Sequence, residues 1–166
     1  MAAGLTYESI ATTTLSSSSA SVTFSSISGS YTDLIAIFNG GSTSAGMDIR
    51  CRFNGDSGSN YSFTFVTGNG STASSNRATS QTFMPLDYNG YLNNSIQTVS
   101  IINLMNYSNS TTYKTTISRF NTTSYGTDAA AGLWRSTSAI TSIEFFPSAN
   151  SFLTGSTFTL YGITKA

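Results

Sequence analysis

Residues 47–53, Met-Asp-Ile-Arg-Cys-Arg-Phe, alternate between apolar and charged side chains without a break. Successive side chains of a β-strand point to opposite sides of the sheet, so this pattern predicts a strand with an apolar inner face and a charged outer face. On the outer face, Arg50 and Arg52 can pair with Asp48 of the same chain or fix the register against a neighbouring chain. We expect the intramolecular pairing and keep both arginines as candidate contacts between subunits.

The same alternation recurs along the chain and predicts further half-buried strands. It is found at residues 21–25, 61–66, 116–120 and 157–161. Denser apolar runs at 34–38 and 99–105 predict central strands that are covered on both sides. Asp128 stands before three alanines as a helix cap would, but Trp134 and the flanking turn residues favour a strand over residues 128–133.

Asn-Gly pairs separate many of these segments and are typical of tight hairpin turns, because both residues reach positive φ at low cost. They lie at 39–40, 54–55, 69–70 and 89–90. Short strands, frequent turns and two prolines predict an all-β fold, an antiparallel, jelly-roll-like β-sandwich of roughly eight to ten strands.

A length of 166 residues predicts one domain over 1–166. Residues 1–20 are expected to form an N-terminal strand and a connector. Residues 67–80, Thr-Gly-Asn-Gly-Ser-Thr-Ala-Ser-Ser-Asn-Arg-Ala-Thr-Ser, are nearly devoid of apolar side chains, and this predicts a long polar loop that is mobile or completed by a partner.

Composition argues against most catalytic chemistry. Seven basic residues balance seven acidic ones, there is no histidine, and one cysteine allows neither an internal disulfide nor a thiolate cluster. The sequence therefore predicts no enzyme, no catalytic residues, no cofactor and no metal site. The five arginines and two lysines form no basic patch for nucleic acid, and no apolar run is long enough to span a membrane. The N-terminus lacks the pattern of a signal peptide.

Two binding alternatives stay open at this stage. The oxygen-rich loop at residues 54–60 offers ligands for calcium, but it has one carboxylate and lacks EF-hand spacing, so we favour a plain hairpin turn. Several aromatic residues are candidates for a sugar-stacking platform or, alternatively, for core positions: Tyr61, Tyr88, Tyr91, Tyr107, Tyr113, Tyr125 and Trp134.

The surface must be built mainly from small polar residues, because only 8% of the residues are charged and about a third are Ser or Thr. Such a surface has little long-range electric field, and its short side chains lose little rotamer entropy in a contact. This composition favours a protein that packs against copies of itself or against a large assembly.

The N-terminal stretch LTYESIATTTLSSSSASVTFSSISGSYTDLIAIFN, residues 5–39, resembles the start of small β-rich virion proteins of tailed bacteriophages, especially those from aquatic hosts. Three later stretches also resemble that family: RFNGD followed by SNYS at 52–62, GLWRS with AITSI at 132–143, and FTLYGI at 158–163. The resemblance implies a structural role in the phage particle and supplies no catalytic residues.

The family includes virion, decoration and tail-fibre proteins, so the resemblance does not settle the location. The compact single domain leads us to expect a capsid decoration (cement) protein that stabilises the head by multivalent contacts. We expect a homotrimer bound to the major capsid protein or other virion proteins, located on the surface of the virion after assembly in the host cytoplasm. The candidate contact residues are Arg50, Arg52, Asn76, Arg77, Trp134 and Arg135. The alternatives are a tail-fibre or baseplate adhesin that binds host-surface polysaccharide and, from another class, a hydrolase of surface glycans.

Overall fold

The computed structural model describes residues 6–94, 98–122 and 126–164. These residues form twelve β-strands. In chain order the strands are β1 (Tyr7–Thr14), β2 (Val22–Phe24), β3 (Asp33–Gly40), β4 (Ile49–Phe53), β5 (Tyr61–Gly68), β6 (Ala73–Gln81), β7 (Met84–Pro85), β8 (Thr98–Met105), β9 (Lys114–Thr122), β10 (Thr127–Trp134), β11 (Ile143–Pro147) and β12 (Thr157–Ile163). Over the described ranges, the chain has no helix of the length and apolarity needed to cross a membrane.

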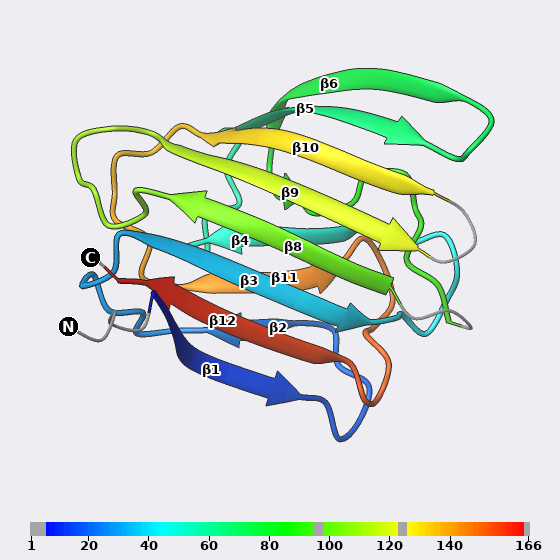
Figure 1. The fold of residues 1–166 in the computed structure, drawn as a ribbon, viewed down its shortest axis with the longest axis horizontal. Helices are drawn as coiled ribbons and strands as arrows, with labels where there is room; N and C mark the ends of the chain where they lie inside the picture. The colour runs from blue at the N-terminus through cyan, green and yellow to red at the C-terminus, as the bar shows by residue number, and fades with distance from the viewer. Residues whose placement is uncertain (1–5, 95–97, 123–125, 165–166) are drawn as a thin grey trace.

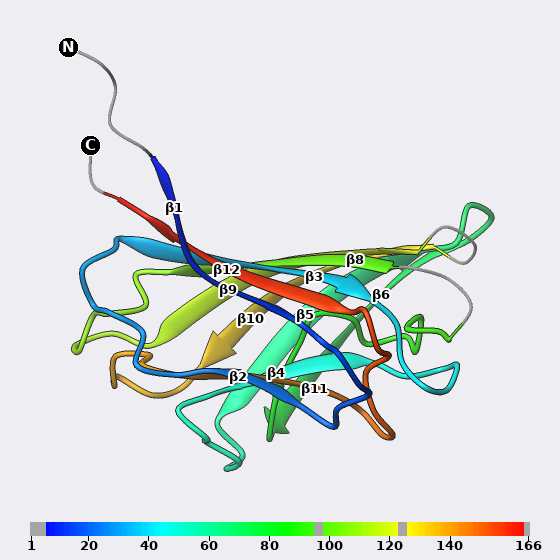
Figure 2. The ribbon, with the colours of Figure 1, turned by 90° about the horizontal axis from the view of Figure 1, so that it is seen from below.

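The strands make two antiparallel sheets that lie in two layers (Figures 1 and 2). The larger sheet has eight strands in the order β1-β12-β3-β8-β9-β10-β5-β6, and the smaller has four in the order β2-β11-β4-β7. The predicted all-β antiparallel sandwich is therefore confirmed, and the strand 128–133 that we favoured over a helix lies within β10.

Eight of the strands follow the order of a jelly roll. Along the chain β1, β3, β8 and β12 belong to the large sheet and β2, β4, β7 and β11 to the small one, and their orders, β1-β12-β3-β8 and β2-β11-β4-β7, are those of the two sheets of a jelly roll. The hairpins β5–β6 and β9–β10 are additions that widen the large sheet beyond β8. They explain why the strand number exceeds the predicted eight to ten.

Aromatic rings fill the space between the two sheets. Phe38 and Phe158 come from the large sheet, and their ring centroids lie 4.9 Å apart. Phe145 of the small sheet lies 5.7 Å from Phe158, and Phe152 from the preceding loop lies 4.9 Å from it. All four side chains are buried, so the alternation of each strand places its larger apolar residues in one continuous core.

The predicted long polar loop at 67–80 is wrong. Residues 61–68 and 73–81 form a hairpin, and β6 pairs with β5 along almost its whole length. Gly70, with φ of 86°, supplies the turn. Backbone hydrogen bonds hold β6 in place although its side chains are mostly exposed, so this edge strand has no apolar alternation that sequence inspection would detect.

Three of the four Asn-Gly pairs lie in turns, and one lies at the end of a strand. Asn54 and Gly55 both have positive φ, 52° and 68°, as expected for a tight hairpin turn. Gly70 and Gly90 also have positive φ within turns. The pair at 39–40 instead ends strand β3, so the prediction of a turn is wrong there.

The runs 34–38 and 99–105 form the central strands β3 and β8, but they are covered on only one side. Leu34 and Phe38 are buried under the small sheet, whereas Ile35, Ile37 and Ile101 are half-buried on the outer side. No described residue of the chain covers that outer face, which corrects the prediction of coverage on both sides.

Replacement of Gly132 should test the contact between β10 and β7. A Cβ atom at Gly132 would lie 2.0 Å from Met84 Sδ and 2.7 Å from Thr116 Oγ1, and both of these neighbours are buried. We expect Gly132→Val to lower the free energy of unfolding by about 1–3 kcal/mol in chemical denaturation, because it overpacks the core. Ala131→Val is the matched control: Ala131 points outward and is exposed, so this change should be nearly neutral. Equal losses in the two variants would contradict this account.

Candidate functional site

The arginines of β4 are engaged within the chain. Arg50 Nη2 lies 2.6 Å from Asp48 Oδ2, and the guanidinium stands over the ring of Phe83 at 4.0 Å. Arg52 Nε donates to the carbonyl oxygen of Thr82 at 3.0 Å, and its Nη1 lies 3.9 Å from Glu144. The expected pairing of Arg50 with Asp48 is confirmed. Both arginines keep part of their surface exposed but hold this side of the small sheet together.

Trp134 and Arg135 also make their side-chain hydrogen bonds within the chain. Trp134 is buried, at 2% exposure, and its indole Nε1 donates to Asp56 Oδ2 at 2.6 Å. Arg135 donates to Ser62 Oγ at 2.9 Å and to the carbonyl oxygen of Ser59 at 3.2 Å. Trp134 is therefore wrong as a surface contact residue, because it packs between the sheets, with its ring stacked on Tyr61 at 6.3 Å.

The oxygen-rich loop at 54–60 is a hairpin turn organised around Asp56. The carboxylate accepts hydrogen bonds from the indole of Trp134, the amide of Asn60 and the backbone N–H of Gly58. Burial by itself would raise the pKa of Asp56, but these donors outweigh it and lower the pKa. Within the described ranges, no group of three or more acidic, cysteine or histidine residues is placed to hold a metal ion.

The aromatic residues do not form one exposed platform. Tyr61, Tyr107 and Trp134 are buried, while Tyr88 and Tyr91 are partly buried against the core. Tyr113 is 53% exposed, and Tyr125 lies outside the described residues. Most of these side chains therefore occupy the core positions that we had named as the alternative.

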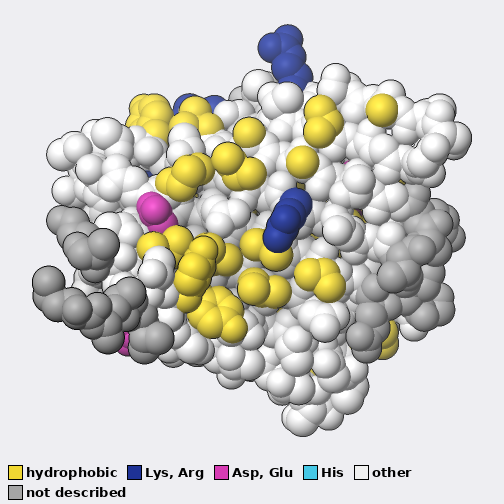
Figure 3. Space-filling view, in the orientation of Figure 1, with side chains coloured by type: hydrophobic (Ala, Val, Ile, Leu, Met, Phe, Trp, Pro, Cys, Tyr) yellow, Lys and Arg dark blue, Asp and Glu magenta, His cyan; other side chains and the backbone are white. Residues whose placement is uncertain are grey.

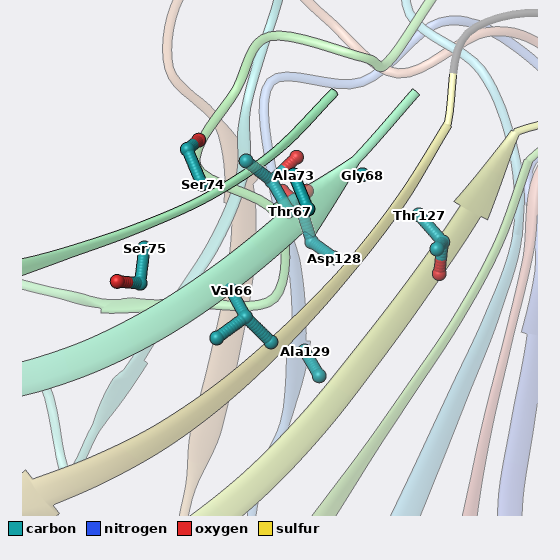
Figure 4. Close-up of a pocket in the computed structure, with 9 residues that line it drawn as sticks. All are labelled: Val66, Thr67, Gly68, Ala73, Ser74, Ser75, Thr127, Asp128 and Ala129. Carbon is teal, nitrogen blue, oxygen red and sulfur yellow. The ribbon is translucent and has the colours of Figure 1, made fainter. Parts of the chain in front are cut away.

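Asn76 and Arg77 lie on the exposed edge strand β6. The first residues of that strand, Ala73, Ser74 and Ser75, line a groove (Figure 4). The groove has a volume of about 500 Å³ and runs over β5, between β6 and β10. Its lining consists of Val66, Thr67, Gly68, Ala73, Ser74, Ser75, Thr127, Asp128 and Ala129. Of the six predicted contact residues, Asn76 and Arg77 are the two whose side chains are exposed on this edge.

The outer face of the large sheet is apolar over its central strands (Figure 3). Ile117 is 52% exposed there and Tyr7 is 57% exposed. A hollow of about 380 Å³ lies between these strands and is lined by Tyr7, Ile35, Ile37, Ile101, Asn103, Arg119 and Tyr161. Sequence inspection missed this surface, because a dense apolar strand looks the same whether its second side is covered or open.

Two buried carboxyl groups, those of Asp87 and Asp128, lie side by side where the loop after β7 meets β10. Asp87 and Asp128 are 1% and 3% exposed and hydrogen-bond to each other. Backbone N–H groups of Asn89 and Tyr91 donate to Asp87, and the Asn89 amide donates to Asp128 at 2.8 Å. Two like charges this close cannot both persist without water, so we infer that the pair shares one proton.

The environment of Asp87 explains its titration. Burial raises the pKa of Asp87 to about 8, and the hydrogen bond with the Asp128 carboxyl and the charge of Asp48 add to the rise. Asp128 Oδ1 is buried and accepts no hydrogen bond from an N–H or hydroxyl group, which fits a proton supplied by Asp87. The pair fixes the loop after β7 against β10. Asp87 and Asp128 are 41 positions apart in the sequence, so inspection could not bring them together.

Comparison with known proteins finds no matching family model and no matching curated protein. Among solved structures, the chain is similar to an alginate lyase mutant in complex with alginate tetrasaccharide, with a TM-score of 0.30 and 7% identity over 82% of this chain and 72% of that one. It is also similar to a protein of unknown function from Shewanella oneidensis MR-1, with a TM-score of 0.24 and 7% identity over 100% of this chain and 83% of that one. Similarity at this level does not indicate a shared function.

The buried pair predicts that stability falls as the pH rises. The folded chain holds the Asp87 proton more tightly than the unfolded chain does. The protonated group therefore contributes its full share to the free energy of unfolding below the pKa that Asp87 has in the unfolded chain. This contribution is lost as the pH rises past the pKa of about 8 in the folded chain. We expect the melting temperature to fall by at least about 5 °C between about pH 5 and about pH 9. The Asp87→Asn variant should lose much of this dependence, because its amide carries no charge at either pH.

Glu144→Gln, which removes a partly exposed acid, is the matched control and should keep the pH dependence of the unaltered protein. An equally steep fall in the Asp87→Asn variant would show that the pair is not its source.

Proposed function

We propose that this protein is a structural component of a tailed-phage virion that decorates the capsid and strengthens it by many repeated contacts. The resemblance of residues 5–39, 52–62, 132–143 and 158–163 to small phage virion proteins supports this role. The balanced and sparse charge supports it further, because it leaves little repulsion between closely packed copies.

The exposed edge strand β6 is the observation that carries the proposal. Seven of its nine residues pair with β5 on one side, and no described strand pairs with the other side. The backbone groups of that free edge are a template for a strand of a neighbouring protein. Apart from Arg77, the strand has only small or uncharged polar side chains, which lose little entropy when they are covered.

Repetition turns a modest contact into a strong one. A decoration protein binds many equivalent positions on one shell, so contacts that are weak singly add by avidity. A chain of twelve tightly packed strands adds rigidity, because its exposed strand is held by a sheet and not by a mobile loop. The protein would thus act mechanically, bridging capsid subunits against the pressure of packaged DNA.

A polysaccharide adhesin is the second candidate, and the groove beside β6 favours it. Val66 and Ala129 provide an apolar floor, and Ser74, Ser75 and Thr127 provide hydroxyl groups near its walls (Figure 4). Such a groove suits an extended sugar chain, which presents both apolar ring faces and hydroxyl groups.

Capsids assembled with and without the protein test the proposal. Capsids that lack it should lose integrity at lower temperature, and adding purified protein should restore their tolerance. Ser75→Lys with Thr79→Lys places two charges on the exposed edge of β6 and should weaken capsid binding at least about tenfold. Ser57→Lys with Ser59→Lys adds the same charge at the exposed 54–60 turn and should bind like the unaltered protein.

The outcomes separate the candidates. Equal heat tolerance with and without the protein would overturn the decoration role. Binding of the isolated protein to host polysaccharide, without binding to capsids, would instead support the adhesin.

A further inference from the structure

The outer face of the large sheet carries apolar side chains over its central strands. On β3, β8, β9 and β12, the outward positions alternate strictly with the buried ones. The apolar outward side chains include Ile35, Ile37, Ile101, Ile117 and Tyr161, and Ile117 is 52% exposed. Burying such side chains removes apolar surface from water, and this stabilises a contact.

The charges on this face show what kind of partner would cover it. Arg119 and Asp33 are the charged residues at outward positions of these four strands. The guanidinium of Arg119 is exposed and makes no ion pair or side-chain hydrogen bond with a described residue. Asp33 accepts the backbone N–H of Asn106 on Oδ1 at 2.6 Å, which leaves Oδ2 available. The face therefore carries one base and one acid that do not contact each other.

The strand register places these two charges symmetrically about one residue. Arg119 pairs with Ile101, and Ile101 pairs with Ile37 on β3, four residues from Asp33. The charges are thus about 10 Å apart across the strands and about 14 Å apart along them. Asn103 pairs with Ile35 on one side and Ile117 on the other, so it occupies the midpoint between Arg119 and Asp33.

We propose that two copies of this chain pair through this face about a two-fold axis that passes at Asn103. This axis runs midway between the large sheets of the two copies and parallel to them. Rotation about it exchanges the positions of Arg119 and Asp33, so each arginine lies opposite the aspartate of the other copy. Asn103 then meets its own copy, and two amide groups satisfy each other with paired hydrogen bonds. In the single chain, Asn103 is half-buried and its amide has no described hydrogen-bond partner.

The same operation brings apolar side chains together. In a regular sheet it places Ile35 over Ile101 of the copy, and Ile117 over Met105 of the copy. Eight strands at a spacing of about 4.8 Å, each about seven residues long at about 3.4 Å per residue, give a flat face of roughly 900 Å². The strands of the two copies cross at about 70° about this axis, so roughly 600 Å² of that flat area faces the copy, against about 800 Å² of accessible surface per partner in a standard interface.

Charge exchange tests the pairing in the purified full-length protein, with mass and dissociation constant measured by analytical ultracentrifugation. Arg119→Asp and Asp33→Arg should each weaken the dimer at least about tenfold, because each places like charges together. The double variant should restore the dimer to near its original strength. Ser57→Asp with Ser59→Asp lowers the net charge by two, as Arg119→Asp does, but away from this face, and should leave dimerisation unaltered.

Cross-linking tests the axis without touching either charge. Asn103→Cys should be joined to its own copy by a short bismaleimide, since facing sheets lie about 10 Å apart. Thr64→Cys is the control: Thr64 is exposed on the same face, but it lies three strands from Asn103, about 14 Å away, and its copy would be out of reach. The native Cys51 is fully buried and should not react.

Three results would overturn the inference. The first is a protein that stays monomeric up to about 1 mM, a concentration at which even weak pairs associate. The second is a trimer in place of a dimer. The third is a dimer whose dissociation constant does not change in the Arg119→Asp variant. The pairing does not depend on the virion role, because a dimer that fails to bind capsids would remove only the proposed function.

Discussion

A four-stranded sheet cannot cover an eight-stranded one, and this mismatch in width shapes the rest of the molecule. The small sheet covers only part of the large one: Phe53 of β4 packs against Tyr61 of β5 and Trp134 of β10. The remaining inner surface of the added strands β9, β10, β5 and β6 needs another cover. The segment from Phe83 to Tyr91 provides it: Phe63 packs against Phe83 at 6.1 Å, Phe65 against Tyr88 at 5.2 Å, and Tyr91 against Phe120 at 6.4 Å. The buried Asp87–Asp128 pair lies where this segment meets β10, and it ties the addition to the jelly roll.

The width of the large sheet also creates its two open surfaces. Because β6 is the last added strand, one side of its backbone pairs with no described strand. Because no third layer exists in the described chain, Ile35, Ile37 and Ile101 stay half-buried on the outer side and Ile117 stays exposed. Edges and apolar faces are the two features by which β-proteins associate. The chain thus presents different chemistry in two directions: hydrogen-bonding backbone at the edge, and a broad apolar face with a balanced pair of charges.

The alternation of apolar and polar residues predicted the strands well, because successive side chains of a pleated strand point to opposite faces of the sheet. Ile49, Cys51 and Phe53 are fully buried, as the pattern at 47–53 indicates, and Asp48 pairs with Arg50 beside them. The prediction failed where stability comes from backbone pairing and not from side chains: the 67–80 segment has no apolar alternation, yet it forms an edge strand and its turn. It failed also for Trp134, whose large ring suggests a contact surface until the Asp56 carboxylate that satisfies its indole is known.

The sequence by itself determined the all-β class, the position of most strands, and a surface poor in charge, because local period and composition do not depend on which strands become neighbours. The tertiary structure alone decided the strand order, and with it the surfaces and sites. Asp87 meets Asp128, Asp56 meets Trp134, and Asn103 stands midway between Arg119 and Asp33 through pairings between distant segments. Which side of an apolar strand stays open is likewise a matter of how many layers the chain can build.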